Sequence, residues 1–157
     1  MSIVDTIYTW RAEGHKIVFT NGVFDILHVG HIQCLKAASE FGSKLIVAIN
    51  DDESVRRLNK GPERPINSEE DRAKVLTAIN CVDLVLIFSQ DSPLEAIELV
   101  QPDILIKGDD YDAACFDPSD SKYIVGSNEV RKNGGEVQTV PIIPGHSTTN
   151  ILKSMKL

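Results

Sequence analysis

Apolar residues form two recurring patterns along this chain. Ile3, Ile7 and Trp10 recur at helical spacing. Ser2 before them and Gly14 after them are typical of the two ends of a helix, so an opening helix is expected. Short apolar runs rich in Ile, Leu, Val and Phe are typical of buried strands. These runs predict five strands, at residues 16–20, 45–49, 84–88, 104–106 and 136–140.

Segments with helical spacing lie between these strands. They predict helices over residues 28–41, 52–58, 68–79 and 93–100, a further helix around Val130, and a last one from about Thr148. Asn67 with Glu70 is expected to cap the third of these, and Ser92 the fourth. Because parallel neighbours need crossover connections, the alternation predicts a doubly wound α/β fold. We expect one domain over residues 1–157, with the helix of residues 1–14 packed on a five-stranded parallel sheet flanked by helices.

Charge and composition narrow the function. A formal net charge of −7 disfavours broad binding to nucleic acid or to an anionic membrane. There is no basic apolar leader and no run of 18 apolar residues, so we expect a cytoplasmic protein. Cys34, Cys81 and Cys115 are odd in number and widely spaced, which favours neither a disulfide framework nor a CxxC metal clip.

The first strand is followed by the segment with the clearest chemistry. Its end at Thr20 places residues 21–27 at the carboxyl edge of the sheet, where ligands of such folds bind. His28 then opens a helix, whose N–H groups attract anions, and Gly22 and Gly30 let a ligand approach the backbone. At spacing i, i+3, His28 and His31 project from one helical face and can both donate hydrogen bonds to a phosphate.

Other interpretations of this segment remain open. One or both histidines could cap the helix or fill a polar gap. His28, His31 and Cys34 share a helical stripe that could hold zinc, although the sequence supplies no clear fourth ligand. Asn21-Gly22 could form a hairpin turn, but the segment after it has helical periodicity.

Further candidates lie in less regular segments. Lys60, Arg64 and Arg72 form a basic cluster that could neutralise phosphates. Lys107, before Gly108, is expected directly after the fourth strand and hence at the same sheet edge. Residues 60–67 and 109–121 are the least regular stretches, and either could be a mobile loop over a site.

Two more features each have two possible roles. Ser147, Thr148 and Thr149 precede the last helix, where they could bind an anion or cap the helix, and these two roles are compatible. Asp25 could order the loop that contains it, which we favour, or help to hold Mg²⁺ through water.

Residues 20–31, from Thr20-Asn21-Gly22-Val23-Phe24-Asp25 to His28-Val29-Gly30-His31, resemble the opening signature of the cytidylyltransferase-like nucleotidyltransferases. This group includes glycerol-3-phosphate cytidylyltransferase and heptose 1-phosphate adenylyltransferase. Four further segments are most similar to the heptose 1-phosphate adenylyltransferase domain. They are Arg64-Pro65-Ile66-Asn67 with Arg72, Lys107-Gly108-Asp109-Asp110-Tyr111, Asn133-Gly134-Gly135-Glu136-Val137 and Ser147-Thr148-Thr149-Asn150-Ile151. The likeness extends from about residue 16 to 153 and implies a five-stranded Rossmann-like sheet.

The resemblance also implies an activity. The implied reaction is the transfer of AMP from ATP to a sugar 1-phosphate, with D-glycero-D-manno-heptose 1-phosphate as the expected acceptor. The products would be ADP-heptose and pyrophosphate. The reaction would be a direct displacement, with Mg²⁺ bound to ATP. In this interpretation the catalytic residues are His28, His31, Lys60 and Lys107, and the nucleotide-binding residues are Thr20, Asn21, Gly22, Phe24, Asp25, Gly30, Arg72, Gly108, Ser147, Thr148 and Thr149. Arg64 and Asp110 would bind the acceptor, and no protein ligand to a metal is assigned.

This chain departs from the family pattern in one place and leaves rival functions open. Family members tend to have Gly-Asp where this chain has Asp109-Asp110, and Asp adopts a left-handed backbone less readily than Gly. Glycerol-3-phosphate cytidylyltransferase is the alternative enzyme, and a non-catalytic nucleotide-binding module is the alternative of another class. An aminoacyl-tRNA synthetase is disfavoured because these 157 residues are acidic and leave no room for a tRNA-binding domain, and a dehydrogenase because no G-x-G-x-x-G follows the first strand. Expected partners are ATP and a sugar 1-phosphate, without nucleic acid or membrane, and a homodimer is compatible with this.

Overall fold

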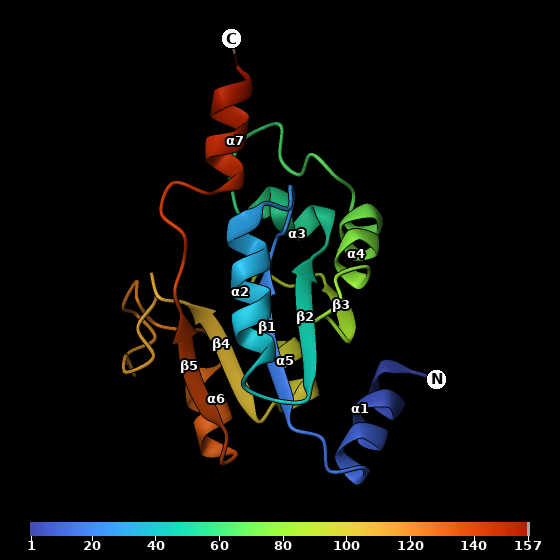
Figure 1. Ribbon diagram of the computed structural model, residues 1–157. Helices are drawn as coiled ribbons and strands as arrows, with labels where there is room; N and C mark the ends of the chain where they lie inside the picture. Colours follow the sequence, from blue (N-terminus) through green and yellow to red (C-terminus); the bar gives the residue numbers. More distant parts are fainter. Residues whose placement is uncertain (157) are drawn as a thin grey trace.

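Five parallel strands form the centre of the molecule in the computed structural model, which describes residues 1–156 (Figure 1). Residue 157, the last of the expected domain, lies outside the described residues. The strands lie in the order β3-β2-β1-β4-β5, and all neighbours pair in parallel. Their bounds are β1 Ile17–Gly22, β2 Lys44–Asn50, β3 Leu84–Phe88, β4 Ile104–Gly108 and β5 Glu136–Val140. The predicted α/β class and the five-stranded parallel sheet are confirmed.

Helices cover both faces of this sheet. Their bounds are α1 Ile3–Ala12, α2 Val29–Ser39, α3 Asp52–Arg57, α4 Glu69–Thr77, α5 Leu94–Val100, α6 Ser127–Lys132 and α7 Thr148–Met155. Helices α1, α5 and α6 contribute apolar side chains to the core on one face, and α2 and α4 to the core on the other. Helix α7 stands beyond the carboxyl edge of the sheet, next to the irregular segment between α3 and α4 (Figure 1).

Strand β1 shows why two core layers form. Ile17 and Phe19 contact the core with α1 and α5, whereas Val18 between them contacts the core with α2. Alternate side chains of a strand point to opposite faces, so a continuous apolar run can fill both layers. All three are fully buried, and each such side chain stabilises the fold by about 1.5–3 kcal/mol relative to its exposed state.

Helix α1 begins as the sequence predicts. The Ser2 hydroxyl accepts from the Asp5 backbone N–H, and the Asp5 carboxylate accepts from the Ser2 backbone N–H, which completes a capping box. Ile7 is buried against the sheet domain, and the Arg11 guanidinium donates to the carbonyls of Val100 and Gln101 at the end of α5. These contacts attach the opening helix to the sheet domain.

Some expected boundaries were wrong. β1 continues through Asn21 and Gly22 because these residues pair with Ala48 and Ile49 of β2, so they belong to the strand rather than to the loop. Likewise, Lys107 lies within β4 rather than after it.

Two predicted helix caps were also wrong. Ser68, not Asn67 with Glu70, caps α4, because the Asn67 backbone and side chain both bond to Asp25. Pro93, not Ser92, is the N-cap residue of α5.

The strand order places a crevice where ligands of this architecture bind. From β1 the chain moves to β2 and β3 on one side and to β4 and β5 on the other, so β1 and β4 flank a topological switch point. The segments that follow β1 and β4 therefore diverge at the carboxyl edge. Among residues 1–156, no helix is long and apolar enough to cross a membrane.

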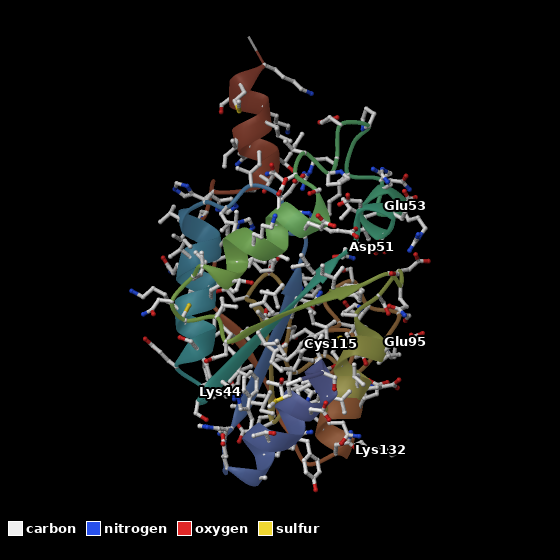
Figure 2. The ribbon with its side chains drawn as sticks, turned by 90° about the vertical axis from the view of Figure 1, so that its right-hand side faces the viewer. Lys44, Asp51, Glu53, Glu95, Cys115 and Lys132 are labelled. Carbon is white, nitrogen blue, oxygen red and sulfur yellow. The ribbon has the colours of Figure 1, made fainter. Side chains whose placement is uncertain are left out.

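The Asn133-Gly134-Gly135 segment lies at the opposite edge. In Figure 2, Lys132 at the end of α6 lies towards the same end of the molecule as Lys44, where β2 begins, and away from Asp51, which follows β2. A Cβ atom on Gly135 would lie 2.7 Å from Val130 Cγ1 and 3.0 Å from the Asp103 carbonyl oxygen. Close packing therefore favours glycine at position 135, and this segment has a structural role.

We predict that Gly135→Ala lowers the free energy of unfolding by about 1–3 kcal/mol, the usual cost of overpacking. Urea unfolding followed by circular dichroism measures this change, with the exposed Lys132→Ala as the matched control. The variant should keep its affinity for nucleotide, because the substitution lies at the far edge of the sheet. Unchanged stability, or a selective loss of nucleotide binding, would contradict the structural role.

Candidate active site

A cavity of about 430 Å³ opens beyond the carboxyl edge of the sheet. Every residue predicted for the site lines it except Asp25 and Arg72. These lining residues are Thr20, Asn21, Gly22, Phe24, His28, Gly30, His31, Lys60, Arg64, Lys107, Gly108, Asp110, Ser147, Thr148 and Thr149. They come from β1, the first turn of α2, the loop after α3, β4 with the residues after it, and the start of α7, so segments far apart in sequence converge here.

His28 is held by the helix that it caps. Its Nδ1 accepts a hydrogen bond of 3.1 Å from the backbone N–H of Gly30. A neutral imidazole that accepts at Nδ1 carries its proton at Nε2, which leaves one donor for a ligand. Burial and then the charge of His146 lower the pKa of His28. The capping interpretation is therefore confirmed for His28, and it is compatible with anion binding.

His31 lies one turn further on and stacks on His28. Their ring centroids are 3.8 Å apart with an interplanar angle of 25°, so both histidines face the same part of the cavity. Burial, and secondly the charge of His28, lower the pKa of His31 to about 4, so this imidazole is neutral at pH 7. Its Nδ1 is buried without a hydrogen-bond partner among the described residues, which is unusual outside ligand-binding sites.

Phe24 closes the other side of the histidine pair. Its ring centroid lies 4.9 Å from that of His31. Its φ of 52° is in the left-handed region, a rare conformation for a bulky residue that is often associated with functional sites. The Phe24 ring also lies 2.9 Å from where a Gly22 Cβ atom would be. Gly22 is thus required by close packing against Phe24.

Lys107 projects from β4 on the other side of the switch point. Burial lowers its pKa, although the carboxylate of Asp110 acts in the opposite direction. Its Nζ lies 3.4 Å from the Asn21 carbonyl oxygen and 5.0 Å from the centroid of the Tyr111 ring. The Lys107 ammonium group therefore lies at the switch point, between β1 and the residues that follow β4.

Asp110 bends back over the end of β4. A Cβ atom on Gly108 would lie 2.6 Å from Ile142 Cγ2 and 2.7 Å from a carboxylate oxygen of Asp110, so a side chain at position 108 would displace one or both of these groups. Asp109, the residue that departs from the family pattern, does not require a left-handed backbone. Among residues 1–156, the non-glycine residues with positive φ are Phe24, Asn59 and Gln101.

Asp25 orders the loop between α3 and α4 and does not line the cavity. Its fully buried carboxylate accepts from the Arg64 Nε at 2.6 Å and from the backbone N–H groups of Ile66 and Asn67. The loop-ordering role is confirmed, and it reaches a segment about 40 residues away rather than only the local turn. Direct contact of Asp25 with a nucleotide is not supported, because its side chain is fully buried and does not line the cavity.

The ordered loop brings two cations to the cavity. Arg64 is almost completely buried against Asp25 but still lines the cavity. Lys60 lies on the exposed rim, where partial burial and the charge of Arg64 lower its pKa. The loop therefore adds the positive charge of Lys60 and Arg64 to that of Lys107 at the cavity.

Arg72, which the sequence predicts to bind nucleotide, does not line the cavity. Its side chain is fully buried, and its guanidinium donates to the carbonyls of Val23, Asn50 and Asn67 and to the Asp52 carboxylate. This side chain lies outside the cavity lining because it satisfies carbonyl groups at the ends of two strands. Arg72 therefore supports the site from behind.

The Ser147–Thr149 segment begins α7 at the cavity. The Ser147 hydroxyl accepts from the Asn150 N–H at 3.0 Å, so its predicted capping role is confirmed. The Thr148 hydroxyl donates to the Ile26 carbonyl oxygen at 3.3 Å and connects α7 to the segment before α2. The first N–H groups of a helix have no partner within it, so the start of α7 can accept an anion.

Several lining residues were missed by the sequence analysis of the site. They are Val23, Tyr111, Ile142, Ile143 and His146. Ile142 and Ile143 follow β5 at the carboxyl edge, and His146 directly precedes the Ser-Thr-Thr segment, so their positions were the available signal. Cys34 also lines the cavity, but no group of three or more His, Cys, Asp or Glu among residues 1–156 could hold a metal ion. The zinc interpretation is therefore not supported.

The arrangement as a whole suits a phosphorylated ligand. Two stacked histidines, three cations from two sides and the start of α7 surround one cavity, whereas Asp110 is the single carboxylate among its described lining residues. Preorganised donors of this kind stabilise charge that develops on transferring phosphoryl groups. Fold and cavity thus define a nucleotide-binding α/β protein of the Rossmann type with a site for phosphoryl chemistry.

Comparisons with known proteins agree with this class. Residues 19–154 match the family described as cytidylyltransferase-like. Two curated relatives are both named "Bifunctional protein HldE". The one from Magnetococcus marinus is 49% identical over 94% of this chain, and the one from Coxiella burnetii is 52% identical over 92% of this chain. A solved structure, the lipopolysaccharide core biosynthesis protein from Thermoplasma volcanium, is 31% identical with a TM-score of 0.62, and the match covers 83% of this chain and 98% of that one.

This chain therefore belongs to the cytidylyltransferase-like family, and it is a nucleotidyltransferase. A pantoate-beta-alanine ligase from Francisella tularensis shares the fold, with a TM-score of 0.59 at 15% identity over 98% of this chain and 75% of that one. The chain spans less than a third of the length of the two HldE relatives, at 28% and 29%.

We predict that Arg72→Met destabilises the protein by about 3–5 kcal/mol, because removing one partner leaves buried carbonyls and Asp52 unpaired. Urea unfolding measures the change. Arg56→Met is the matched control, since the Arg56 side chain is exposed on a helix and pairs with the exposed Glu53, and it should alter stability by less than about 1 kcal/mol. An Arg72→Met protein with normal stability but weak ATP binding would restore the original prediction.

We also predict a pH-dependent difference in stability between the wild type and His31→Gln. Because the folded pKa of His31 is lowered to about 4 from 6.5, the unfolded chain binds the proton first as pH falls. From pH 6.5 down to pH 4 the wild type should therefore lose about 2 kcal/mol more unfolding free energy than the variant. Urea titrations at each pH measure this, and parallel curves for the two proteins would show that His31 titrates normally.

Proposed function

We propose that this nucleotidyltransferase transfers AMP from ATP to D-glycero-D-manno-heptose 1-phosphate, releasing pyrophosphate and forming ADP-heptose. The observation that carries the phosphate chemistry is the His28–His31 stack, which faces the same cavity as Lys107 and the start of α7. The acceptor is inferred from the similarity to proteins named HldE and from the motifs shared with heptose 1-phosphate adenylyltransferase domains.

The proposed reaction needs little proton transfer. An oxygen of the sugar 1-phosphate forms a bond to the α-phosphorus of ATP, while the bond from that phosphorus to the bridging oxygen breaks and its electron pair leaves with pyrophosphate. A phosphate nucleophile is already ionised at neutral pH, so the protein chiefly positions the reactants and stabilises charge. This agrees with a site in which no histidine is paired with a Ser or Cys nucleophile among the described hydrogen bonds.

Each group around the cavity has a role in this proposal. His28 and His31 donate to the α-phosphate as neutral imidazoles, and His28 does so through Nε2. Lys107, in β4, and Lys60, in the loop after α3, offset negative charge on the phosphates. The N–H groups of residues 147–149 and the hydroxyls of Ser147 and Thr149 bind the β- and γ-phosphates of the nucleotide, whereas the Thr148 hydroxyl stays bonded to the Ile26 carbonyl.

The acceptor side is assigned to Arg64 and Asp110. The Arg64 Nε is committed to Asp25, which leaves the rest of the guanidinium for the acceptor phosphate. Asp110 is a carboxylate among cations and can accept hydrogen bonds from sugar hydroxyls. Thr20, Asn21, Gly22, Phe24, Gly30 and Gly108 would shape the nucleotide subsite between them.

Mg²⁺ is proposed to enter with ATP. The described residues include no cluster of three metal ligands, and Asp110 is the carboxylate at the cavity, which suits an ion held mainly by phosphates. When bound, the ion would neutralise charge on the triphosphate. The residues of this chain would bind and orient the phosphates around it.

The test is pyrophosphate release with Mg-ATP or Mg-CTP, each paired with the heptose 1-phosphate or with glycerol 3-phosphate. We expect activity with ATP and the heptose 1-phosphate. His31→Ala should remain folded and reduce kcat by about 100-fold or more, the scale seen when a preorganised donor to developing charge is lost.

Each other outcome has a defined meaning. Activity only with CTP and glycerol 3-phosphate would replace the proposed substrates with those of a glycerol-3-phosphate cytidylyltransferase. Inactivity with all four pairs would indicate a non-catalytic nucleotide-binding module. Near-normal turnover by a folded His31→Ala protein would remove His31 from the mechanism.

A further inference from the structure

We propose that His146 is a third histidine of the active site and that it donates a hydrogen bond to the leaving pyrophosphate. This inference rests on the proposed function, because it assigns a residue to one product of that reaction. His146 lines the cavity but lies on a different segment from the His28–His31 pair.

A tight turn fixes the position of His146. The His146 N–H donates to the Ile143 carbonyl oxygen at 3.4 Å, and Pro144 and Gly145 lie between them. Gly145 has a φ of +80°. Proline followed by a residue with positive φ is typical of a type II turn. The next residue, Ser147, caps α7, so His146 lies between this turn and the start of the helix.

His146 also lies against the first turn of α2. Its carbonyl oxygen is 3.4 Å from where a Cβ atom on Gly30 would be, so the two backbones approach closely. The charge of His146 contributes to the lowered pKa of His28, after the larger effect of burial. His146 is therefore a neighbour of the histidine pair as well as of the α7 terminus.

This position suits one part of the nucleotide. A triphosphate that extends from the histidine pair to the start of α7 passes His146 between its α-phosphate and its outer phosphates. The bond from the α-phosphorus to the bridging oxygen breaks here, and negative charge grows on the pyrophosphate side. The His146 side chain is exposed to the cavity solvent, so its ring can turn towards that charge without unfavourable repacking.

The direct test is binding of inorganic pyrophosphate, measured by calorimetry on the wild type and on His146→Ala. We expect His146→Ala to weaken pyrophosphate binding about 10-fold, the usual scale for a lost hydrogen bond to a charged group. Binding of AMP, which lacks the β- and γ-phosphates, should stay unchanged. His146→Gln keeps an N–H donor and should retain most of the pyrophosphate affinity.

His15→Ala is the matched control, because His15 lies before β1, near Ser43, and does not line the cavity. It should leave the binding of both ligands unchanged. Equal pyrophosphate affinity in His146→Ala and the wild type, or an equal loss of AMP binding, would overturn the assignment. Because binding is measured without turnover, a wild type that binds pyrophosphate through His146 but has no transferase activity would refute the proposed function alone.

Discussion

Parallel pairing of β1 with both β2 and β4 is the constraint on which the rest of this molecule depends. It makes β1 the centre of the sheet and sends the following segments to opposite sides, so that a crevice opens at the carboxyl edge. The first turn of α2 and the Lys107 side chain face each other across this crevice because they follow or end these two strands. Both faces of β1 are buried, which keeps the pairing rigid.

The second requirement of the site is the buried carboxylate of Asp25. An ionised carboxylate is costly to bury unless charge and N–H donors surround it, and Arg64 with the loop backbone supplies both. The same bonds place Lys60 and Arg64 at the cavity, so the stability of the loop and the charge of the site are coupled. Arg72 acts similarly outside the cavity lining, because it donates to the carbonyls of Val23, directly after β1, and of Asn50, the last residue of β2.

The local charge of the site differs from that of the whole chain. A net charge of −7 coexists with a cavity lined by Lys60, Arg64, Lys107 and three histidines. The buried His31 is neutral at pH 7, so it acts as an oriented donor rather than as a permanent cation. Positive charge can thus be gathered locally at one cavity in a chain whose net charge is negative.

The sequence by itself determined the elements and most of the cavity, because apolar periodicity sets strands and helices and because residues after parallel strands must meet at one edge. His28, His31, Lys107 and Ser147–Thr149 could be assigned on that basis. Only the tertiary structure decided which of the remaining charged side chains line the cavity and which are buried outside its lining. Arg64 and Arg72 look alike in sequence, yet Arg72 is fully buried by carbonyls from distant strands, and Asp25 binds a loop 40 residues away. His146 was missed for the same reason, since its place beside α2 depends on contacts between segments more than a hundred residues apart.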